Sequence, residues 1–196
     1  MQRLRMIRTA VMAILGTALV TFSLVPDVPA QGESPKSMRI SAVAQGTSTQ
    51  LGKIVNVDII IREYSTDEER AALLGAFQAK GSTGLARALN KMSGKGRIAI
   101  TGTLGYDLNY IRLVDTPTGK KIRFVTDRAI TFREAYYDTR SRDYDLSAGE
   151  IDLGTGDGKA TGVLFPACQF SLDKNNQLEI ELRRNAWKLV NIQIHE

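Results

Sequence analysis

Apolar and polar residues alternate at every second position through most of this chain. Near its start, the apolar face of one segment is formed by Met38, Ile40, Ala42 and Ala44. A period of two places successive side chains on opposite faces of a β-strand, so that one face can be buried. From Arg97 to the C-terminus such segments recur at intervals of about eight to twelve residues, the spacing typical of all-β folds. The chain is therefore predicted to be mainly β.

The first two predicted strands, Met38–Ala44 and Val55–Ile61, form a hairpin around Gly46–Gly52. The later predicted strands are Ile98–Leu104, Tyr106–Tyr110, Ile122–Phe124, Ile130–Tyr136, Tyr144–Leu153, Leu164–Phe170, Leu178–Leu182 and Val190–Ile194. Pro166 lies inside one of them and cannot donate a ladder hydrogen bond, which indicates an edge position or a β-bulge.

No predicted strand is a continuous apolar run, and no helical pattern recurs between the later strands. Both features favour an antiparallel sheet. A sheet of so many strands has edges that must be paired or covered, and closure solves this problem. We expect an antiparallel barrel or a two-sheet sandwich of about nine or ten strands. Alternation alone does not separate these two architectures.

One stretch between the second and third strands breaks the period of two. The segment 65–69, Ser-Thr-Asp-Glu-Glu, contains two overlapping capping boxes, which mark the start of a helix. An apolar stripe with helical spacing follows and ends at Gly81, and a second stripe covers 85–92. We therefore expect a helical hairpin inserted at about 66–93.

Residues 1–30 have the features of a secretory signal peptide. Three arginines precede the uncharged run 9–25, and Val28-Pro-Ala supplies small residues before a cleavage point. An uncleaved anchor is the alternative, although this run is at the short limit of a membrane span. Residues 31–37 then form a short polar tether, and 38–196 a single β-rich domain. We expect an exported protein, periplasmic or secreted, without a transmembrane segment after cleavage.

Four phrases of the sequence are distinctive in their order and spacing. They are Ser65-Thr-Asp-Glu-Glu-Arg, Val125-Thr-Asp-Arg-Ala-Ile-Thr-Phe, Arg140-Ser-Arg-Asp-Tyr and Gly149-Glu-Ile-Asp-Leu. With these phrases the chain resembles an uncharacterised family of exported bacterial proteins, which have a signal peptide and one β-rich domain. The resemblance covers most of the region from the second strand to the C-terminus. It implies export and a single domain, and it implies no activity, because the family has no assigned catalytic or binding residues.

The chain has one cysteine, Cys168, and one histidine, His195. This excludes an intrachain disulfide framework and a Cys-rich or His-rich metal site. Cys168 shares the parity of the apolar residues in its strand, so we expect it to point inward, where burial makes a thiol inert. His195 is the penultimate residue and is poorly placed as the base of a catalytic triad. We expect no cofactor and no metal, and we favour a protein that is not an enzyme.

The stretch from Asp127 to Glu150 gathers acidic, basic and aromatic residues. The candidate cluster is Asp127, Arg128, Glu134, Arg140, Arg142, Asp143, Tyr144 and Glu150, with Arg133, Tyr136 and Tyr137 beside them. Paired carboxylates can act as general acid and base, as glycosidases require, and tyrosines can stack on a sugar. We favour the alternative, which is a set of cross-strand ion pairs on a solvated face.

Two further patterns of charged residues resemble ion-binding features. The segment Asp152–Gly158 offers acidic oxygens and flexible turns to a calcium ion, but it lacks the EF-hand spacing, so we expect a hairpin turn. Two groups of basic residues attract phosphate-bearing partners such as anionic lipid headgroups. The first group is Arg87, Lys91, Lys95 and Arg97, and the second is Lys120, Lys121 and Arg123. Nucleic acid is disfavoured, because the chain has no binding motif, a modest net charge once residues 1–30 are removed, and an exported compartment.

Together these patterns favour a non-enzymatic binding or envelope-interaction module. We expect the interior of the sheet or its helix-covered mouth to accept a small apolar ligand or a lipid, an expectation that rests on architecture. Two alternatives remain: a carboxylate-dependent enzyme that acts on glycans, and a structural component of an envelope assembly.

Overall fold

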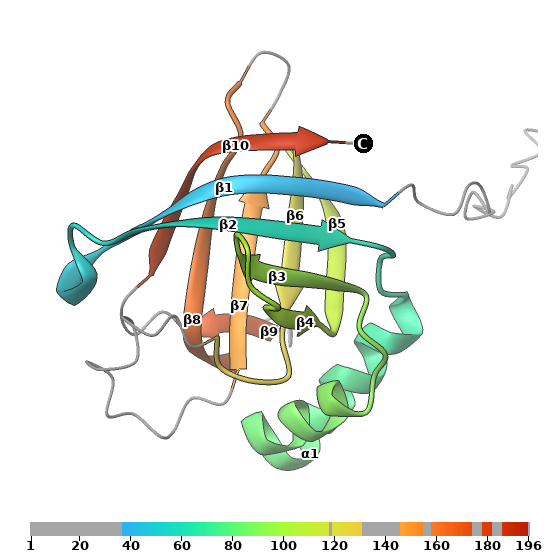
Figure 1. The fold of residues 1–196 in the computed structure, drawn as a ribbon. Coiled ribbons are helices and arrows are strands. Elements are labelled where there is room, and N and C mark those ends of the chain that lie inside the picture. The colour runs from blue at the N-terminus through green and yellow to red at the C-terminus, as the bar shows by residue number, and fades with distance from the viewer. Residues whose placement is uncertain are drawn as a thin grey trace, which may run out of the picture. The chain divides into compact units, whose positions relative to one another are not determined.

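The computed structural model describes residues 37–117, 119–130, 146–154, 158–173, 178–181 and 186–195. All of them belong to one compact unit, Glu33–Glu196. Its strands are β1 (Met38–Gly46), β2 (Ile54–Ile61), β3 (Gly96–Ile100), β4 (Tyr106–Leu108), β5 (Tyr110–Thr116), β6 (Gly119–Val125), β7 (Leu146–Asp152), β8 (Thr161–Leu172), β9 (Leu178–Glu181) and β10 (Trp187–His195) (Figure 1). One α-helix, α1 (Asp67–Asn90), and a short 3-10 helix, η1 (Ser48–Gln50), accompany them. The predicted mainly β fold is confirmed.

The strands form a single antiparallel sheet. Its order is β4-β3-β2-β1-β10-β8-β7-β6-β5, and β9 pairs with the end of β8. The sheet curls, so that β2 and β3 pass in front of β6 and β7 in Figure 1. The antiparallel prediction is therefore confirmed.

The sheet is not closed into the predicted barrel, and its strands do not separate into the predicted two-sheet sandwich. Its two edge strands, β4 and β5, are joined by the single residue Asn109, and no ladder pairs them within the described residues. A hairpin connection needs a loop of about two residues to reverse the chain. One residue is too short for this reversal, so β4 and β5 do not form a hairpin. They are consecutive in the chain but lie at opposite edges of the sheet.

The curl brings apolar side chains from both ends of the strand order into one group, which we call the enclosed cluster. Its members are Ile40, Ala42, Ala44, Val57, Ile59, Ile61, Ile98, Leu108, Ile111, Ile122, Phe124, Ile130, Ile151, Leu164, Trp187 and Leu189. The alternation predicted for β1 and β2 is confirmed, because the residues of one parity in each strand belong to this cluster.

The helix begins at the second of the two predicted capping boxes. The Thr66 hydroxyl accepts a hydrogen bond from the Glu69 backbone N–H at 3.2 Å, and the Glu69 carboxylate accepts one from the Thr66 N–H at 2.9 Å. The neighbouring Ser65 has a different role, because its hydroxyl accepts a hydrogen bond from Ile111 N–H at 3.1 Å. This hydrogen bond connects the start of α1 to strand β5.

The predicted helical hairpin is not supported. The structure has one helix with a kink, where the backbone leaves helical geometry at Lys80 (φ −144°) and Gly81 (φ 58°, ψ −150°). The positive φ at Gly81 suits a residue without a Cβ. The two halves approach closely, since a Cβ on Gly84 would lie 2.2 Å from the Ala76 carbonyl oxygen. A two-residue break of this kind bends the helix without the reversing loop of a hairpin.

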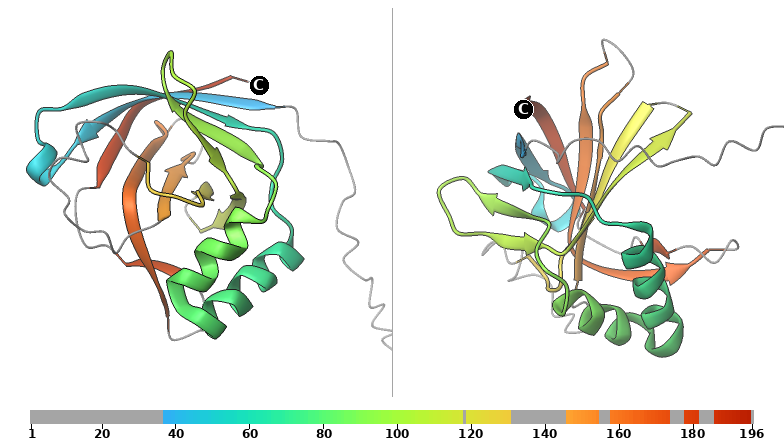
Figure 2. Two further views of the ribbon diagram at one scale, coloured as in Figure 1. Left: turned by 60° about the horizontal axis from the view of Figure 1, so that its bottom comes forward. Right: turned by 90° about the vertical axis from the view of Figure 1, so that its right-hand side faces the viewer.

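Helix α1 covers part of the other face of the sheet, on the side away from β10 and β1 (Figure 2). The buried residues between them form the helix-covered cluster, which comprises Leu73, Leu85, Leu89, Leu146, Ala148, Phe165, Cys168 and Phe170. The predicted inward orientation of Cys168 is confirmed, and burial raises the pKa of its thiol to about 12.

Several local predictions need correction. Leu104 does not continue β3 but lies 81 % exposed in the following turn. The predicted strand Tyr106–Tyr110 is divided at Asn109, and Ile130 lies outside any strand. The rest of the strand predicted at Ile130–Tyr136 lies outside the described residues, as do the signal peptide and all of the tether except Ser37.

The irregularity predicted at Pro166 is confirmed as a β-bulge. Leu146 pairs with Cys168 and Ala148 with Phe165, so β8 carries one residue more than β7 between these pairs. The Pro166 carbonyl turns out of the ladder and accepts a hydrogen bond from Ile130 N–H at 3.0 Å.

No helix in the described part of the chain has the length and apolar character that crossing a membrane requires.

Candidate functional site

The predicted polar cluster is described only in part. Asp127 and Arg128 follow β6, and Glu150 belongs to β7. The other candidates lie outside the described residues: Glu134, Arg140, Arg142, Asp143 and Tyr144, together with Arg133, Tyr136 and Tyr137. Glu150 lines the cavity described below, and Asp127 does not.

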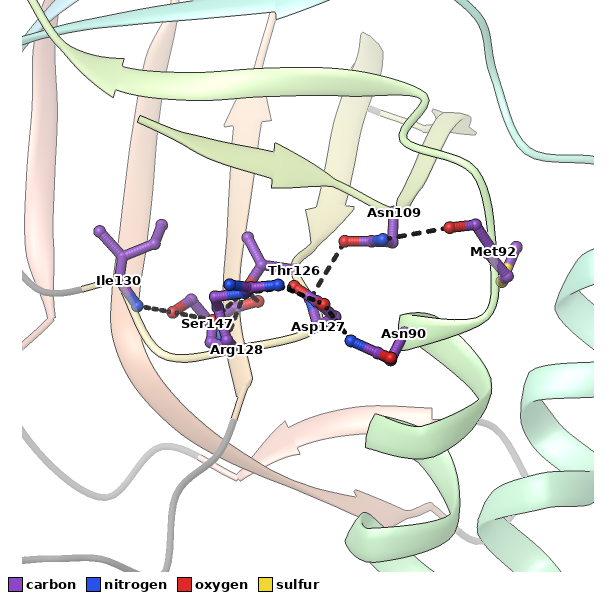
Figure 3. A network of polar contacts seen from close by, with 8 residues as sticks. All are labelled: Asn90, Met92, Asn109, Thr126, Asp127, Arg128, Ile130 and Ser147. Carbon is purple, nitrogen blue, oxygen red and sulfur yellow. Dashed lines mark hydrogen bonds and ion pairs between the residues drawn. The ribbon is translucent and has the colours of Figure 1, made fainter. Parts of the chain in front are cut away.

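Asp127 connects the end of α1 to the loop after β6 (Figure 3). Its carboxylate accepts hydrogen bonds from Arg128 Nε and Nη2, both at 3.0 Å, and from Asn90 Nδ2 at 2.7 Å. Its backbone N–H donates to Asn109 Oδ1 at 3.2 Å. The guanidinium of Arg128, followed by the amide of Asn90, keeps the pKa of Asp127 below its usual value. Asp127 is therefore an ionised anchor.

Two fully buried hydroxyls continue this polar network into the sheet. The Ser147 hydroxyl accepts a hydrogen bond from Ile130 N–H at 2.6 Å and donates to the Pro166 carbonyl. The Thr126 hydroxyl accepts from Ser147 N–H at 3.1 Å and donates to the Arg128 carbonyl. The network thus holds the bulge of β8, strand β7 and the loop after β6 together (Figure 3).

Glu150 lies in a ladder of cross-strand ion pairs. Its carboxylate accepts hydrogen bonds from Lys121 Nζ at 2.9 Å and from Arg123 Nε at 2.7 Å, and Lys121 also pairs with Asp152 at 3.3 Å. Partial burial alone would raise the pKa of Glu150, but the two cations outweigh it and lower this pKa. Neither Asp127 nor Glu150 has the raised pKa of a general acid. The contacts of each carboxylate with neighbouring cations match the ion-pair interpretation.

The other singled-out residues are also held by neighbours. Asp152 Oδ1 accepts a hydrogen bond from Gly154 N–H at 2.9 Å, as in a turn, and Asp157 lies outside the described residues. Lys95 is buried and pairs with Glu63 and Glu69, both at 2.9 Å. No group of three or more His, Cys, Asp or Glu side chains within the described ranges is arranged to hold a metal ion.

A cavity of about 560 Å³ lies between α1 and the sheet. Its apolar lining comes from the helix through Leu73, Leu74, Leu85 and Leu89, and from the sheet through Val125, Phe170, Leu178 and Ile180. Gly149 forms part of the wall, and a Cβ there would lie 2.2 Å from the ring of Phe124. The absence of a Cβ at Gly149 therefore leaves room for the far end of this ring.

Charged residues and a phenol complete the lining. The cations are Arg70 from α1, Arg112 from β5 and Arg123 from β6, and the acids are Glu150 and Asp173. Tyr110 also contributes, and burial raises the pKa of its phenol, so the hydroxyl stays protonated at neutral pH. The cavity thus combines an apolar interior with several hydrogen-bond donors.

Sequence reasoning found Arg123 and Glu150 but missed Arg70, Tyr110 and Arg112. The predicted strand Tyr106–Tyr110 ends before Arg112, so it does not relate Arg112 to Tyr110. With the strand boundary placed at Asn109, the shared parity of Tyr110 and Arg112 puts both residues on one face. Nothing local marks Arg70, because only the folded helix brings it to the cavity.

Comparison with known proteins gives no relative from which a role could be transferred. No protein family matches the sequence, and the comparisons with curated proteins and with solved structures find no match. The resemblance to exported bacterial proteins therefore stays a prediction.

Proposed function

We propose that the protein is an exported, non-enzymatic binding module and that the cavity beneath α1 accepts a small apolar ligand or the apolar part of a lipid. The cavity carries this proposal. Its volume of about 560 Å³ is in the range of small-molecule sites, and apolar side chains dominate its lining. The signal-peptide pattern of residues 1–30 supports export.

The helix is fixed at both ends, which supports a preformed cavity. At its start, Ser65 N–H donates to the Ile111 carbonyl at 2.7 Å, and at its end Asn90 donates to Asp127. A helix attached in this way resists sinking onto the sheet, so the space beneath it persists when it is unoccupied. Preformed sites of this kind lose little conformational entropy when a ligand binds.

Calorimetric titration with decanol tests the proposal. Leu74 lines the cavity and is only partly buried, so Leu74→Trp should fill the space with limited strain. We expect this variant to bind decanol at least about tenfold more weakly than the wild type. A tenfold loss corresponds to about 1.4 kcal/mol of binding free energy, the scale expected for lost apolar contact. Leu104→Trp is the matched control, since Leu104 lies on an exposed turn outside the cavity lining.

Two results would count against this function. One is the absence of decanol binding to the wild-type protein. The other is an equal loss of affinity in Leu74→Trp and Leu104→Trp, because such a loss would not depend on the cavity.

The glycan-acting alternative lacks a comparable observation among the described residues, since Asp127 and Glu150 are both paired with cations.

The alternative of a structural component in an envelope assembly is favoured by one observation. Leu51 and Ile54, at the β1–β2 hairpin tip, are 81 % and 66 % exposed, as an apolar contact surface would be. If assembly through this tip is a second role, Leu51→Asp should abolish any self-association seen by sedimentation. A monomeric wild-type protein at all concentrations would contradict assembly of the chain with itself.

A further inference from the structure

We propose that the occupant of the cavity is an anionic amphiphile, whose carboxylate or phosphate head binds the arginine rim formed by Arg70, Arg112 and Arg123. Its single apolar chain would extend toward Leu85 and Leu89. This inference rests on the proposed function and specifies the chemistry of the ligand.

The strand register places two of these cations against each other. Arg112 of β5 lies directly opposite Arg123 of β6, and Arg123 lies opposite Glu150 of β7. Like charges in directly opposed positions destabilise a sheet. Glu150 offsets the charge of Arg123 and Asp67 that of Arg112, and an anion bound between the two guanidinium groups would offset the repulsion that remains.

The carboxylates already present do not use all the donors of the rim. Within the described residues, Arg123 donates through Nε to Glu150, and Arg112 donates through Nη1 to Asp67. Each guanidinium carries five N–H donors in a planar fork, which suits bidentate binding of a carboxylate or phosphate. No carboxylate in the described part of the chain forms an ion pair with Arg70. The rim therefore keeps donors for an additional anion.

Glu150 also pairs with a second cation, Lys121. Its second oxygen accepts the hydrogen bond from Lys121, and Lys121 also holds Asp152. Asp67 is 80 % exposed and lies outside the cavity lining. Among the described residues, the lining thus presents three arginines and two carboxylates, Glu150 and Asp173.

The three rim arginines act on a common point inside the cavity. Burial raises the pKa of the Tyr110 phenol, the positive charges of Arg112, Arg70 and Arg123 each lower it, and the negative charge of Asp67 raises it. All three guanidinium groups therefore lie within Coulombic range of one half-buried hydroxyl. A neutral phenol can donate a hydrogen bond to the same anionic head.

The test compares four ligands with the same ten-carbon chain by titration calorimetry: decanoate, decyl phosphate, decanol and decylamine. We expect the two anionic ligands to bind the wild-type protein about tenfold or more tightly than decanol, the scale of one charge-assisted hydrogen-bonded contact. Decylamine should bind more weakly than decanol. Inorganic phosphate alone should bind far more weakly than decyl phosphate, because it lacks the chain.

Variants of the rim identify the head site. Arg70→Gln and Arg112→Gln should each lower the ratio of decanoate affinity to decanol affinity, measured in the same variant, by most of its wild-type value. Arg87→Gln removes the same charge from the same helix, but Arg87 is exposed in the last turn and outside the lining, so this variant should behave as the wild type. Thermal unfolding of each variant verifies that the fold is retained.

The outcomes separate this inference from the proposed function. Equal affinity for decanol and decanoate would overturn the anionic head but leave the apolar site. Equal loss in Arg70→Gln and Arg87→Gln would also overturn it, because the effect would then come from net charge. Phosphate binding as tight as decyl phosphate would indicate a free-anion site and overturn the amphiphile. No binding by any of the four ligands would overturn the proposed function itself.

Discussion

The two faces of the curled sheet bury apolar side chains in different ways. On one face, the enclosed cluster collects side chains from nine strands, including a fully buried tryptophan, Trp187. On the other face, the helix-covered cluster is smaller, and the cavity of about 560 Å³ lies beside it. Both faces use the same alternating strands, so the difference comes from what covers each face.

A sheet that curls on itself brings two pleated surfaces into contact, and their side chains interdigitate at high density. The single helix α1, with its kink at Gly81, covers only part of the other face, and the cavity lies between this helix and the sheet (Figure 2). Three arginines and two carboxylates are among the described residues that line it. The comparison suggests that the enclosed cluster stabilises the fold, while the helix-covered side supplies a site.

The largest expected effect separates the two faces by stability. Ile59 is fully buried in the enclosed cluster, and Ile59→Ala should lower the free energy of unfolding by about 2–5 kcal/mol. Leu74→Ala should cost less than about 1 kcal/mol, because Leu74 borders a space that already exists. Urea unfolding of both variants gives the comparison. Equal costs would mean that the two faces are packed alike.

The next effect concerns the polar network between the faces. Ser147→Ala removes the acceptor of Ile130 N–H and the donor to Pro166, both buried. We expect a loss of about 1–3 kcal/mol in the free energy of unfolding, the net contribution of the two buried hydrogen bonds that this hydroxyl makes, while Ile130 N–H keeps its bond to the Pro166 carbonyl. Ser93→Ala, on an exposed turn, should change it by less than about 0.5 kcal/mol. A Ser147→Ala variant as stable as Ser93→Ala would show that the network contributes nothing.

A smaller effect is expected at the start of the helix. Thr66→Ala removes the hydroxyl of the capping box and should cost about 1 kcal/mol of stability. Thr66→Ser keeps the hydroxyl and should retain most of it. Thermal unfolding measures both variants. If Thr66→Ser is as unstable as Thr66→Ala, the hydroxyl is not what caps α1.

The smallest effect is a pH dependence at the other end of the helix. The pKa of Asp127 in the folded protein is below its unfolded value of about 3.9, so the unfolded chain binds a proton first as the pH falls. The stability from Asp127 is thus present above about pH 4 and is lost as the pH falls through the folded pKa. Urea unfolding between about pH 6 and pH 3 should show a shallower decline for Asp127→Asn. Identical slopes would exclude this linkage.

Much of the strand pattern was accessible from the sequence, because burial follows a period of two. Val57, Ile59 and Ile61 could be assigned to one face from their spacing alone. The capping box at Thr66 and the bulge at Pro166 were also predictable, since each depends on local chemistry: a hydroxyl three residues before a glutamate, and a missing N–H. Gly81 marked the break in the helix correctly.

Sheet closure and the kinked helix could not be predicted in this way. The sheet is open, with Asn109 as the single residue between its edge strands β4 and β5, and alternation does not reveal which strands become edges. A glycine break is equally compatible with two separate helices and with one bent helix. The angle between the two halves is set by their packing against the sheet, which a local pattern does not contain. The cavity depends on the same packing: Arg70, Arg112 and Leu178 come from three distant segments, and no local pattern relates them.

The most direct test of the central claim is a measurement of intermolecular nuclear Overhauser effects from ¹³C-labelled decanoate to the protein's methyl groups. The account predicts contacts to Leu73, Leu85 and Leu89 beneath α1, and none to Ile59 or Leu164 of the enclosed cluster. Contacts to Ile59 or Leu164, or no contacts to the three leucines with saturating decanoate, would contradict it.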